Sequence, residues 1–561
     1  MEIQKKCCIF ALRKIALHCA KCNNMYKYPK SQINRRCFLK KHTVSDVTKN
    51  IRNKFVVIAA VIPQTAMTQE CDKPSLTDSI EYGVEMQATA SAGDGHTPLW
   101  LNANKYGLSS LERSNGYLRA TLQLPTAAGS RWGVGYGIDM AAAYNFTSTV
   151  IVQQAYIEGR WLRGVLTIGS KQQPMELKNQ ELSSGPQTLG INARPVPQVR
   201  IALPEYWNIP GTRGWLALKG HIAYGMTTDD NWQKDFTKKQ SRYTQNALYH
   251  SKAGYLRIGG RSLPVSLEAG LEMAALFGGT TYKMDNGVER IDNQGGLKGM
   301  WDALIPGGSE PIEDVYQNVG GDQLGSWVLR LSYDAPAWQA AVYWDHFFED
   351  HSAMFHLDYD GYGTGEEWNV KKDNRYFMYG FKDMLLGAEL RLKRTPWLSA
   401  IVLEYMYTKY QSGPVYHDHT PSMPDHTGGM DNYYNHHIFT GWQHWGQVMG
   451  NPLYLSPIYN TDGRIEVKNN RFTALHAGAS GDISGNLHYR LLGSLQKGWG
   501  TYHVPYPDPR SSMSLMLEAC YRFPQTSPLG GWSVTAAAGL DSGELRGTSQ
   551  GLQMTIRKKW R

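Results

Sequence analysis

The sequence lacks any long hydrophobic run. The longest covers residues 55–62 and ends at Pro63, whereas a membrane-spanning helix needs about 20 consecutive apolar residues. With a mean hydropathy of −0.44, the chain is not a helical membrane protein. Chain-wide disorder is also excluded, because apolar residues make up 42% and aromatic residues 11% of the chain. With 57 Gly, 33 Tyr and 17 Trp among 561 residues, a large all-β protein remains, and a closed barrel of this size can be a single domain.

Cysteine is scarce and unevenly distributed. The first 69 residues hold five of the seven, and only Cys71 and Cys520 lie beyond them. So few thiols in a long body indicate an oxidising compartment. Cys19 and Cys22 could form half of a zinc site, but no second Cys or His pair follows at ligand spacing.

Charge divides at the same place as cysteine. Residues 1–69 carry 14 Lys and Arg against 2 acids, and the rest carries 44 bases against 47 acids. A basic stretch at 50–54, the apolar run at 55–62 and small residues before Gln69 predict a signal peptide over residues 50–69. Residues 1–49 are then a basic upstream extension, such as a misassigned start codon produces, or alternatively a genuine basic N-terminal domain. Residues 70–561 form the exported body.

From residue 80 onward the sequence alternates with period two. Apolar and polar residues take turns in segments that include 82–90, 265–273 and 513–523, and similar segments lie near 117–124, 134–144, 215–225, 327–333, 338–345, 386–393, 487–497 and 532–540. This pattern predicts strands with one apolar and one polar face. It fits either a soluble sandwich or a membrane barrel.

The details of these segments favour a barrel. They are 8–13 residues long, longer than the five or six residues common in soluble sheets. Their apolar faces begin or end in aromatics such as Tyr82, Trp215 and Trp338, as an interfacial girdle requires. The chain also ends in an alternating segment with Trp560 next to last. We expect a transmembrane, antiparallel outer-membrane β-barrel whose long loops at 280–325, 346–384 and 409–470 lie outside the cell.

The densest cluster of unusual residues lies at 409–470. Planar aromatics can stack on sugar rings while neighbouring imidazoles and amides bond the hydroxyls, so the cluster predicts a carbohydrate-binding surface. A transition-metal site and a packed loop wall without a ligand remain alternatives. The predicted binding residues are Trp442, Trp445, Tyr433, Tyr434, His436 and His444, and His417 and His419 are further members of the cluster.

Other candidates for chemistry are weaker. The acidic, glycine-rich stretch 358–367 misses the twelve-residue calcium pattern. Asp345, Glu349 and Asp350 offer paired carboxylates, as a glycosidase needs, but no nucleophile elbow, phosphate loop or zinc helix is present. We therefore predict no enzymatic activity, no catalytic residues, no cofactor and no metal.

Several short elements resemble the Wzi capsule assembly family of Gram-negative outer membranes. The resemblance is clearest in the run containing Asn192, Ala193, Pro195 and Pro197, and other similar positions are 174–177, 184–185, 404–405 and 445–450. It implies a barrel of 18 strands with an occluded lumen. It also implies a non-catalytic lectin that anchors capsular polysaccharide at the cell surface.

One departure from that family concerns the plug. The known members begin with a helical bundle that closes the periplasmic end, but about ten residues separate the predicted cleavage site from the first strand here. A plug must then come from stretches such as 94–114 or 171–195. The alternative function is an outer-membrane porin or sugar-diffusion channel. Expected partners are capsular polysaccharide, outer-membrane lipids and the barrel-insertion machinery, with no nucleic acid.

Overall fold

The computed structural model describes residues 80–126, 130–259, 263–284, 287–305, 321–349, 356–358, 375–377, 382–416 and 427–560. The chain divides into a unit at Met1–Ser75 and a unit at Leu76–Arg561, and only the second contains described residues. The predicted extension 1–49, the signal peptide 50–69 and Cys71 lie outside them.

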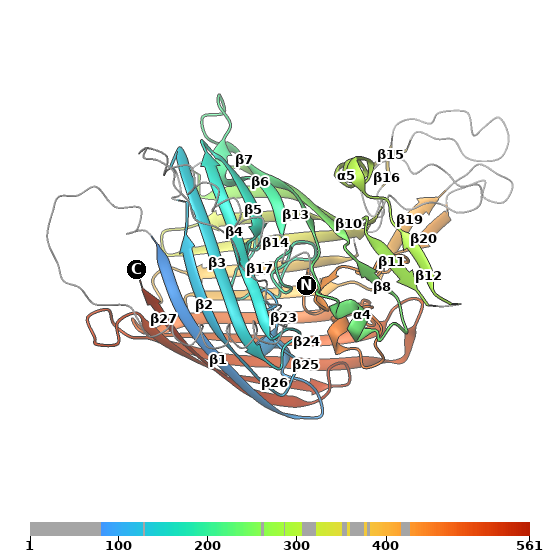
Figure 1. Cartoon of the computed structure of the whole chain (residues 1–561). Coiled ribbons are helices and arrows are strands. Elements are labelled where there is room, and N and C mark those ends of the chain that lie inside the picture. Colours follow the sequence, from blue (N-terminus) through green and yellow to red (C-terminus); the bar gives the residue numbers. More distant parts are fainter. Residues whose placement is uncertain are drawn as a thin grey trace, which may run out of the picture. The chain divides into compact units, whose positions relative to one another are not determined.

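The described chain is built around one antiparallel sheet of 18 strands (Figure 1). Its strands are β1 (Glu81–Gly93), β2 (Ser114–Leu124), β3 (Trp132–Tyr144), β4 (Val150–Trp161), β5 (Gly164–Ser170), β6 (Gln198–Asn208), β7 (Leu216–Met226), β9 (Leu248–Ile258), β10 (Val265–Phe277), β13 (Asp322–Asp334), β14 (Trp338–Glu349), β17 (Met384–Leu392), β18 (Ala400–Tyr407), β23 (Phe472–Ser484), β24 (Leu487–Gly500), β25 (Pro505–Arg522), β26 (Trp532–Gly543) and β27 (Ser549–Trp560).

The sheet closes on itself. The last strand pairs with the first in a ladder that runs from Tyr82 opposite Trp560 to Gly93 opposite Ser549. Each strand therefore has two neighbours, and no edge is left to expose unpaired backbone groups to lipid. The prediction of an all-β, antiparallel barrel of 18 strands is confirmed.

The two faces of the wall differ as the alternation predicts. On β1, Met86 is 53% exposed and points outward, whereas its neighbour Glu85 is 5% exposed and points into the lumen. Outward positions on the other strands are likewise mostly Leu, Ile, Val, Ala and aromatic residues. An apolar exterior around a polar interior is the arrangement of an outer-membrane barrel.

Connections alternate between a turn end and a loop end. Short turns such as 162–163, 335–337 and 485–486 lie at one end, with the start of β1 and the end of β27. The turn end also carries an exposed aromatic belt of Tyr82, Trp132, Trp161, Trp215, Tyr333, Trp338, Trp397 and Trp560. Long connections lie at the other end, which faces the outside of the cell in bacterial barrels.

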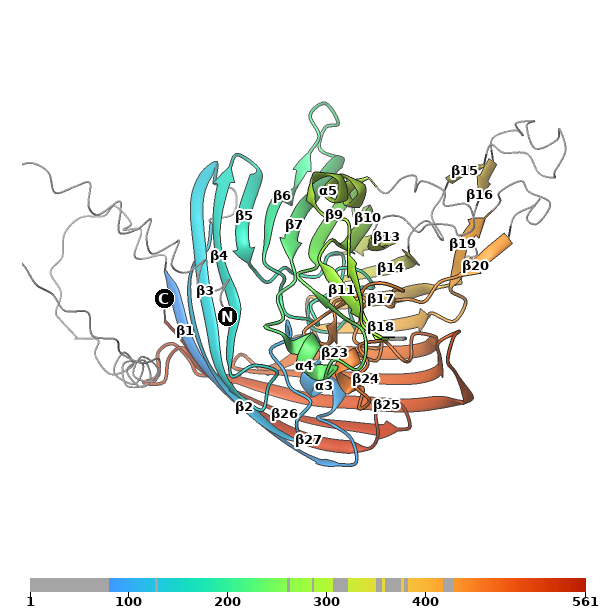
Figure 2. The ribbon, with the colours of Figure 1, turned by 45° about the vertical axis from the view of Figure 1, so that its right-hand side comes forward.

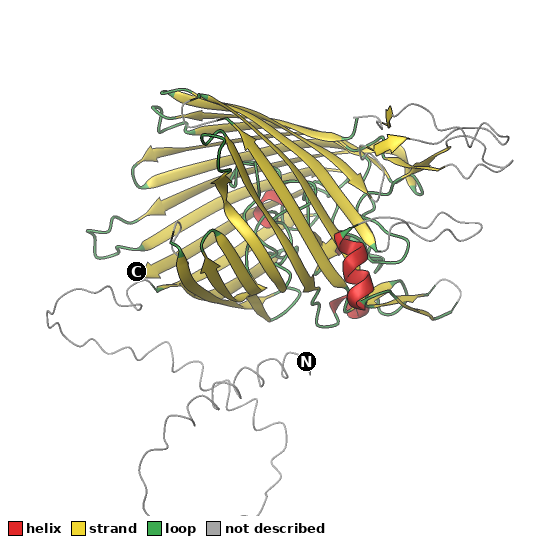
Figure 3. Cartoon of the chain, turned by 90° about the horizontal axis from the view of Figure 1, so that it is seen from above, coloured by secondary structure: helices red, strands yellow, loops and turns green. Residues whose placement is uncertain are grey.

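Small elements decorate the loop end (Figures 1 and 2). They comprise β8 (Tyr243–Gln245), β11 (Thr280–Lys283), β12 (Glu289–Asp292), β15 (His356–Asp358), β16 (Arg375–Phe377), β19 (Ser412–Tyr416), β20 (Thr427–Met430), α4 (Trp232–Phe236) and α5 (Gly296–Leu304). Four more lie in segments that enter the lumen, namely α3 (Leu99–Asn102), β21 (Gln443–His444), β22 (Gln447–Val448) and η2 (Pro457–Tyr459). Viewed from above, strands dominate and helices are few (Figure 3). Of the helices in the described part of the chain, none has the length and apolar character needed to cross a membrane.

Candidate functional site: the barrel lumen

Three loop-end segments, 94–113, 171–197 and 431–470, fold back into the barrel and are mostly buried there. We call them the plug. Each bonds an inward-facing wall residue: the Leu99 amide donates to Asp541 (2.9 Å), the Lys178 ammonium to Asp345 (2.8 Å), and the Gln496 amide to the Leu453 carbonyl (2.8 Å). The lumen is therefore occluded by loops, and the first two segments are those that the sequence pointed to.

Asn192 joins the three plug segments. Its Oδ1 accepts the Asn104 amide at 3.1 Å, and its Nδ2 donates to the Val448 carbonyl at 3.0 Å. Ala193 next to it is buried in the plug core, and Pro195 accepts the Ser170 hydroxyl through its carbonyl at 3.1 Å. The Pro197 carbonyl accepts the Met226 amide at 3.2 Å. The motif that suggested a family thus has a structural role in holding the plug.

Two charged contacts attach segment 171–197 to the wall. The ion pair between Lys178 and Asp345 leaves each side chain only 1% exposed. Glu404 on β18 accepts the Ser183 hydroxyl (2.6 Å), the Ser184 amide (2.8 Å) and the Tyr343 hydroxyl (2.5 Å). The contacts of Lys178, Ser183 and Ser184 with the wall cross more than 150 residues of sequence, so no local pattern could predict them.

Most of the predicted sugar-binding aromatics are buried inside the plug. Trp442 is 1% exposed and donates its indole N–H to the Thr188 carbonyl at 3.0 Å. Tyr433 donates to Asp383 at 2.8 Å, and Tyr434 donates to the Gln187 carbonyl. A ring that stacks on sugar must present a free face, and these rings present none. All three are packed in the hydrophobic core.

The remaining predicted residues are also engaged. His444 is buried; its Nδ1 donates to the Arg194 carbonyl at 2.7 Å, and its Nε2 accepts the Thr228 amide at 3.1 Å. Its burial lowers its pKa to about 4, so the ring is neutral at physiological pH. The ring of Trp445 is covered by the Arg194 guanidinium at 4.1 Å. His436 is half-buried and lines a cavity at the loop end.

That loop-end cavity, of about 640 Å³, contains charged groups of both signs. Asp322, Glu349 and Asp431 lie on its wall beside Arg242 and His436. Glu349 accepts the Tyr434 amide at 2.6 Å, and Asp345 pairs with Lys178. Both carboxylates of the predicted pair therefore bond residues of the plug. Asp350, His417, His419 and most of 358–367 lie outside the described residues. Among the described residues no group of three His, Cys, Asp or Glu side chains could hold a metal ion.

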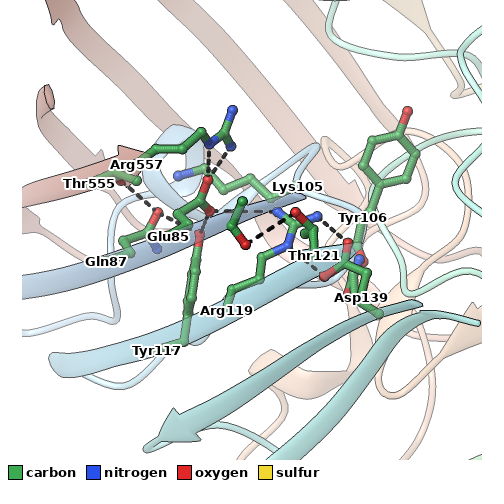
Figure 4. Close-up of polar contacts among 12 residues, drawn as sticks. Glu85, Gln87, Lys105, Tyr106, Tyr117, Arg119, Thr121, Asp139, Thr555 and Arg557 are labelled. Carbon is green, nitrogen blue, oxygen red and sulfur yellow. Dashed lines mark hydrogen bonds and ion pairs between the residues drawn. The ribbon is translucent and has the colours of Figure 1, made fainter. Parts of the chain in front are cut away.

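A larger cavity of about 1200 Å³ lies at the turn end. Figure 4 shows the polar network on its wall. Glu85 accepts the Tyr117 hydroxyl (2.5 Å) and pairs with Arg557, while Arg119 lies 3.6 Å from Glu85 and bonds both oxygens of Asp139. Such paired charges fix the side chains along the wall of a wet lumen.

The turn-end cavity has an excess of positive charge. Its lining includes six bases and three acids. The bases are Lys105, Arg119, Arg522, Arg557, Lys558 and Lys559, and the acids are Glu85, Asp139 and Glu518. Lys105 belongs to the plug, and its ammonium donates to the Gln553 amide oxygen. Burial lowers its pKa to about 8.

Beyond Tyr106, which also lines the turn-end cavity, lies a narrow pocket of about 90 Å³. Its cations are Lys171, Arg194 and Arg200. Lys171 is neutralised by Glu158. Arg194 is buried, and burial lowers its pKa to about 10. Among the described residues, its guanidinium contacts the Thr147 hydroxyl (3.2 Å) and the Trp445 ring and pairs with no carboxylate.

Arg200 points inward from β6 into the same pocket. It has no hydrogen bond or ion pair within the described part of the chain, and Glu176, the acid whose charge reaches it, is paired with Lys219. The pocket thus holds two guanidinium groups without a carboxylate partner. Neither was predicted from the sequence. The signal that could have identified Arg200 is its inward position in the alternating segment 198–202.

Comparisons with known proteins give only distant likenesses. No protein-family model and no curated protein matches the chain. Among solved structures, OprD from Pseudomonas aeruginosa is 10% identical, with 86% of this chain and 94% of that chain covered and a TM-score of 0.41. OccK3 (OpdO) from the same organism is 11% identical, with 86% and 96% covered and a TM-score of 0.41. OccK1 (OpdK), also from Pseudomonas aeruginosa, is 9% identical, with 86% and 99% covered and a TM-score of 0.42.

These findings correct the expected family. No family model matches the chain, and the solved structures named above are OprD and Occ proteins, none of them a Wzi capsule assembly protein; the predicted Wzi membership is wrong. The predicted capsule lectin is wrong with it, and the burial of Trp442, Tyr433 and Tyr434 removes the surface on which it depended. The chain is an outer-membrane β-barrel, because its 18 strands close completely around a polar interior and expose an apolar exterior.

Proposed function

We propose that this protein is a non-enzymatic outer-membrane channel for small anionic solutes. The observation that carries the proposal is the pocket with Arg194 and Arg200, two guanidinium groups without a carboxylate partner in the described part of the lumen. A buried charge is costly without a counter-charge. An anion that enters the pocket supplies one, and guanidinium groups hold carboxylate or phosphate in planar geometry.

The surroundings of the pocket support the same direction of selectivity. The turn-end cavity has twice as many bases as acids, and a lumen of one prevailing sign concentrates solutes of the opposite sign. The plug lies between this pocket and the loop-end cavity, so conduction requires part of the plug to shift. A neutral sugar gains nothing from the two arginines, which separates this proposal from a general sugar-diffusion channel.

The test is conductance of the purified full chain in planar bilayers under a salt gradient. We expect a reversal potential of the sign that marks anion preference, and we expect Arg194→Gln combined with Arg200→Gln to move it toward zero. The matched control is Arg163→Gln, which removes an exposed cation from the turn between β4 and β5.

Three results would contradict the proposal. One is cation preference in the unaltered protein. Another is a permeability that is the same for a neutral hexose and for the corresponding hexuronate in liposome swelling. Absence of current altogether, with a correctly folded barrel, would also reject it.

A further inference from the structure

Four cations line up on the outer surface of the barrel at the loop end. They are Lys382, Lys409, Arg471 and Lys497, on the neighbouring strands β17, β18, β23 and β24 or directly beside them. We call them the cationic arc. Each lies on the same side of its strand as a lipid-facing leucine, respectively Leu386, Leu403, Leu475 and Leu495, all of which are exposed.

The strand register places these cations side by side although they span more than 100 residues of sequence. Met384 pairs with Tyr407, Tyr407 with Thr473, and Thr473 with Lys497. Continued by two residues, the same register sets Lys382 beside Lys409 and Lys409 beside Arg471. Neighbouring strands are about 4.8 Å apart, so the arc is a continuous row of positive charge.

Aromatic rings hold the arc in place. Lys382 lies 4.6 Å from the centre of the Tyr410 ring, Lys409 lies 3.7 Å from the Trp499 ring, and Arg471 lies 3.7 Å from the Tyr502 ring. Lys497 lies 5.7 Å from the centre of the same Trp499 ring. Cation–π contacts orient an ammonium or guanidinium group but leave its charge uncompensated.

No carboxylate pairs with these cations within the described part of the chain. The outward positions of the four strands carry apolar, Thr, Tyr, Trp or Gly residues and no acid. Asp383, the acid whose charge reaches Arg471, is buried on the lumen side and accepts the amides of Tyr410 and Gln411 and the Tyr433 hydroxyl. At the turn end, by contrast, exposed Lys393 is paired with Asp334.

The arc stands at the height of lipid head groups. Trp397 lies in the turn-end aromatic belt. A strand that advances about 3.3 Å per residue and tilts by about 40° from the barrel axis places Lys409 roughly 30 Å above Trp397 along that axis. The apolar band of an outer-membrane barrel is about 25 Å tall. Cations at this level face the outer leaflet just beyond its hydrocarbon.

We propose that the cationic arc binds the phosphate groups of a phosphorylated glycolipid in the outer leaflet. The four unpaired cations match a headgroup with more than one phosphate, and the leucines below them contact its acyl chains. The inference rests on the outer-membrane location alone and is independent of the proposed channel function.

The test is native mass spectrometry of the detergent-purified full chain, titrated with lipid A that carries two phosphates and with lipid A from which both are removed. We expect binding of the phosphorylated form and at least tenfold weaker binding of the other. Changing all four cations to Gln should weaken binding of the phosphorylated form by at least tenfold, whereas Lys393→Gln at the turn end should leave it unchanged.

Further variants keep the test decisive. Heat-modifiable gel mobility reports whether the fourfold variant folds. If it does not, Lys382→Gln combined with Lys497→Gln changes only the two exposed members and should still weaken binding about threefold. Lys409→Arg, which keeps the charge, should retain it. Equal binding of both lipids, undiminished binding by the variants, or displacement of the lipid by millimolar inorganic phosphate would overturn the proposal.

Discussion

The barrel wall and the plug are held in place by different kinds of interaction. In the wall, ladder hydrogen bonds join each strand to two neighbours, and one alternating pattern serves every strand. In the plug, side chains satisfy irregular backbone, as Asn192 does for Asn104 and Val448. Tyr434 and Trp445 in the plug have φ values of 67° and 56°, which side chains of this size rarely adopt. Such backbone persists only where its surroundings determine it, so the plug depends on individual long-range contacts.

The largest test of this difference removes the buried ion pair. Lys178→Met leaves Asp345 buried without its partner and should destabilise the seating of the plug by about 3–5 kcal/mol. The measurement is the denaturant dependence of protease cleavage within 171–197, while gel mobility reports the wall. Lys393→Met breaks an exposed pair with Asp334 and should cost less than about 1 kcal/mol. If the two variants lose the same stability, the plug does not depend on individual buried contacts more than the wall does, and the comparison is contradicted.

A second test compares the two faces of one strand. Glu404→Ala removes the acceptor of three hydrogen bonds. Each donor left unpaired in the interior should weaken the anchoring of the plug by about 1–3 kcal/mol. Leu403→Ala, one residue earlier, changes a side chain that faces lipid. Its effect should be small, because lipid tails are as apolar as leucine. The same protease assay decides between them, and a larger loss from Leu403→Ala would contradict the roles assigned here.

A third test uses pH to change the charge of Lys105, which belongs to the plug. Lys105 has a pKa of about 8, lowered from 10.5 by burial, so it loses its charge as pH rises from 7 to 9 while the arginines of the wall stay charged. Anion preference, read from the reversal potential, should fall over that interval.

The unfolded chain keeps this proton up to about pH 10.5, so the contribution of Lys105 to stability rises from pH 8 upward. Lys105→Arg should abolish the pH dependence; if the dependence persists, another group causes it.

The smallest effect should come from the thiol in the wall. Cys520 is a half-buried free cysteine on the lumen side of β25. Cys520→Ser, alone or with Cys71→Ser, should leave barrel yield and heat-modifiable mobility unchanged. A clear loss of folded barrel in the double variant would show that a bridge involving Cys71 supports the wall.

Much of the wall could be predicted from the sequence. Alternation identified strands such as 82–90 and 265–273, predicted which face of each strand is apolar, and placed aromatics such as Trp338 at strand ends. Six strands were not singled out, namely β4, β5, β6, β9, β18 and β23. The seven or eight residues of β5 and β18 give little room for a pattern, and the pairings of β4 with β3 and of β6 with β7 contain register shifts. Plug segments 94–114 and 171–195 were identified only as stretches without alternation, and the residues that anchor them were not.

The sequence by itself determined the alternation, and with it an apolar exterior, a polar lumen and the membrane in which the barrel resides, because the side-chain period of a strand is local. Only the tertiary structure decided that segment 431–470 turns inward, which buries Trp442 and Tyr434 where a sugar-binding surface was expected. It alone brought Lys382, Lys409 and Arg471 into one row and Arg194 and Arg200 into one pocket. Those arrangements depend on strand register and loop direction, which are set by contacts between residues far apart in the chain.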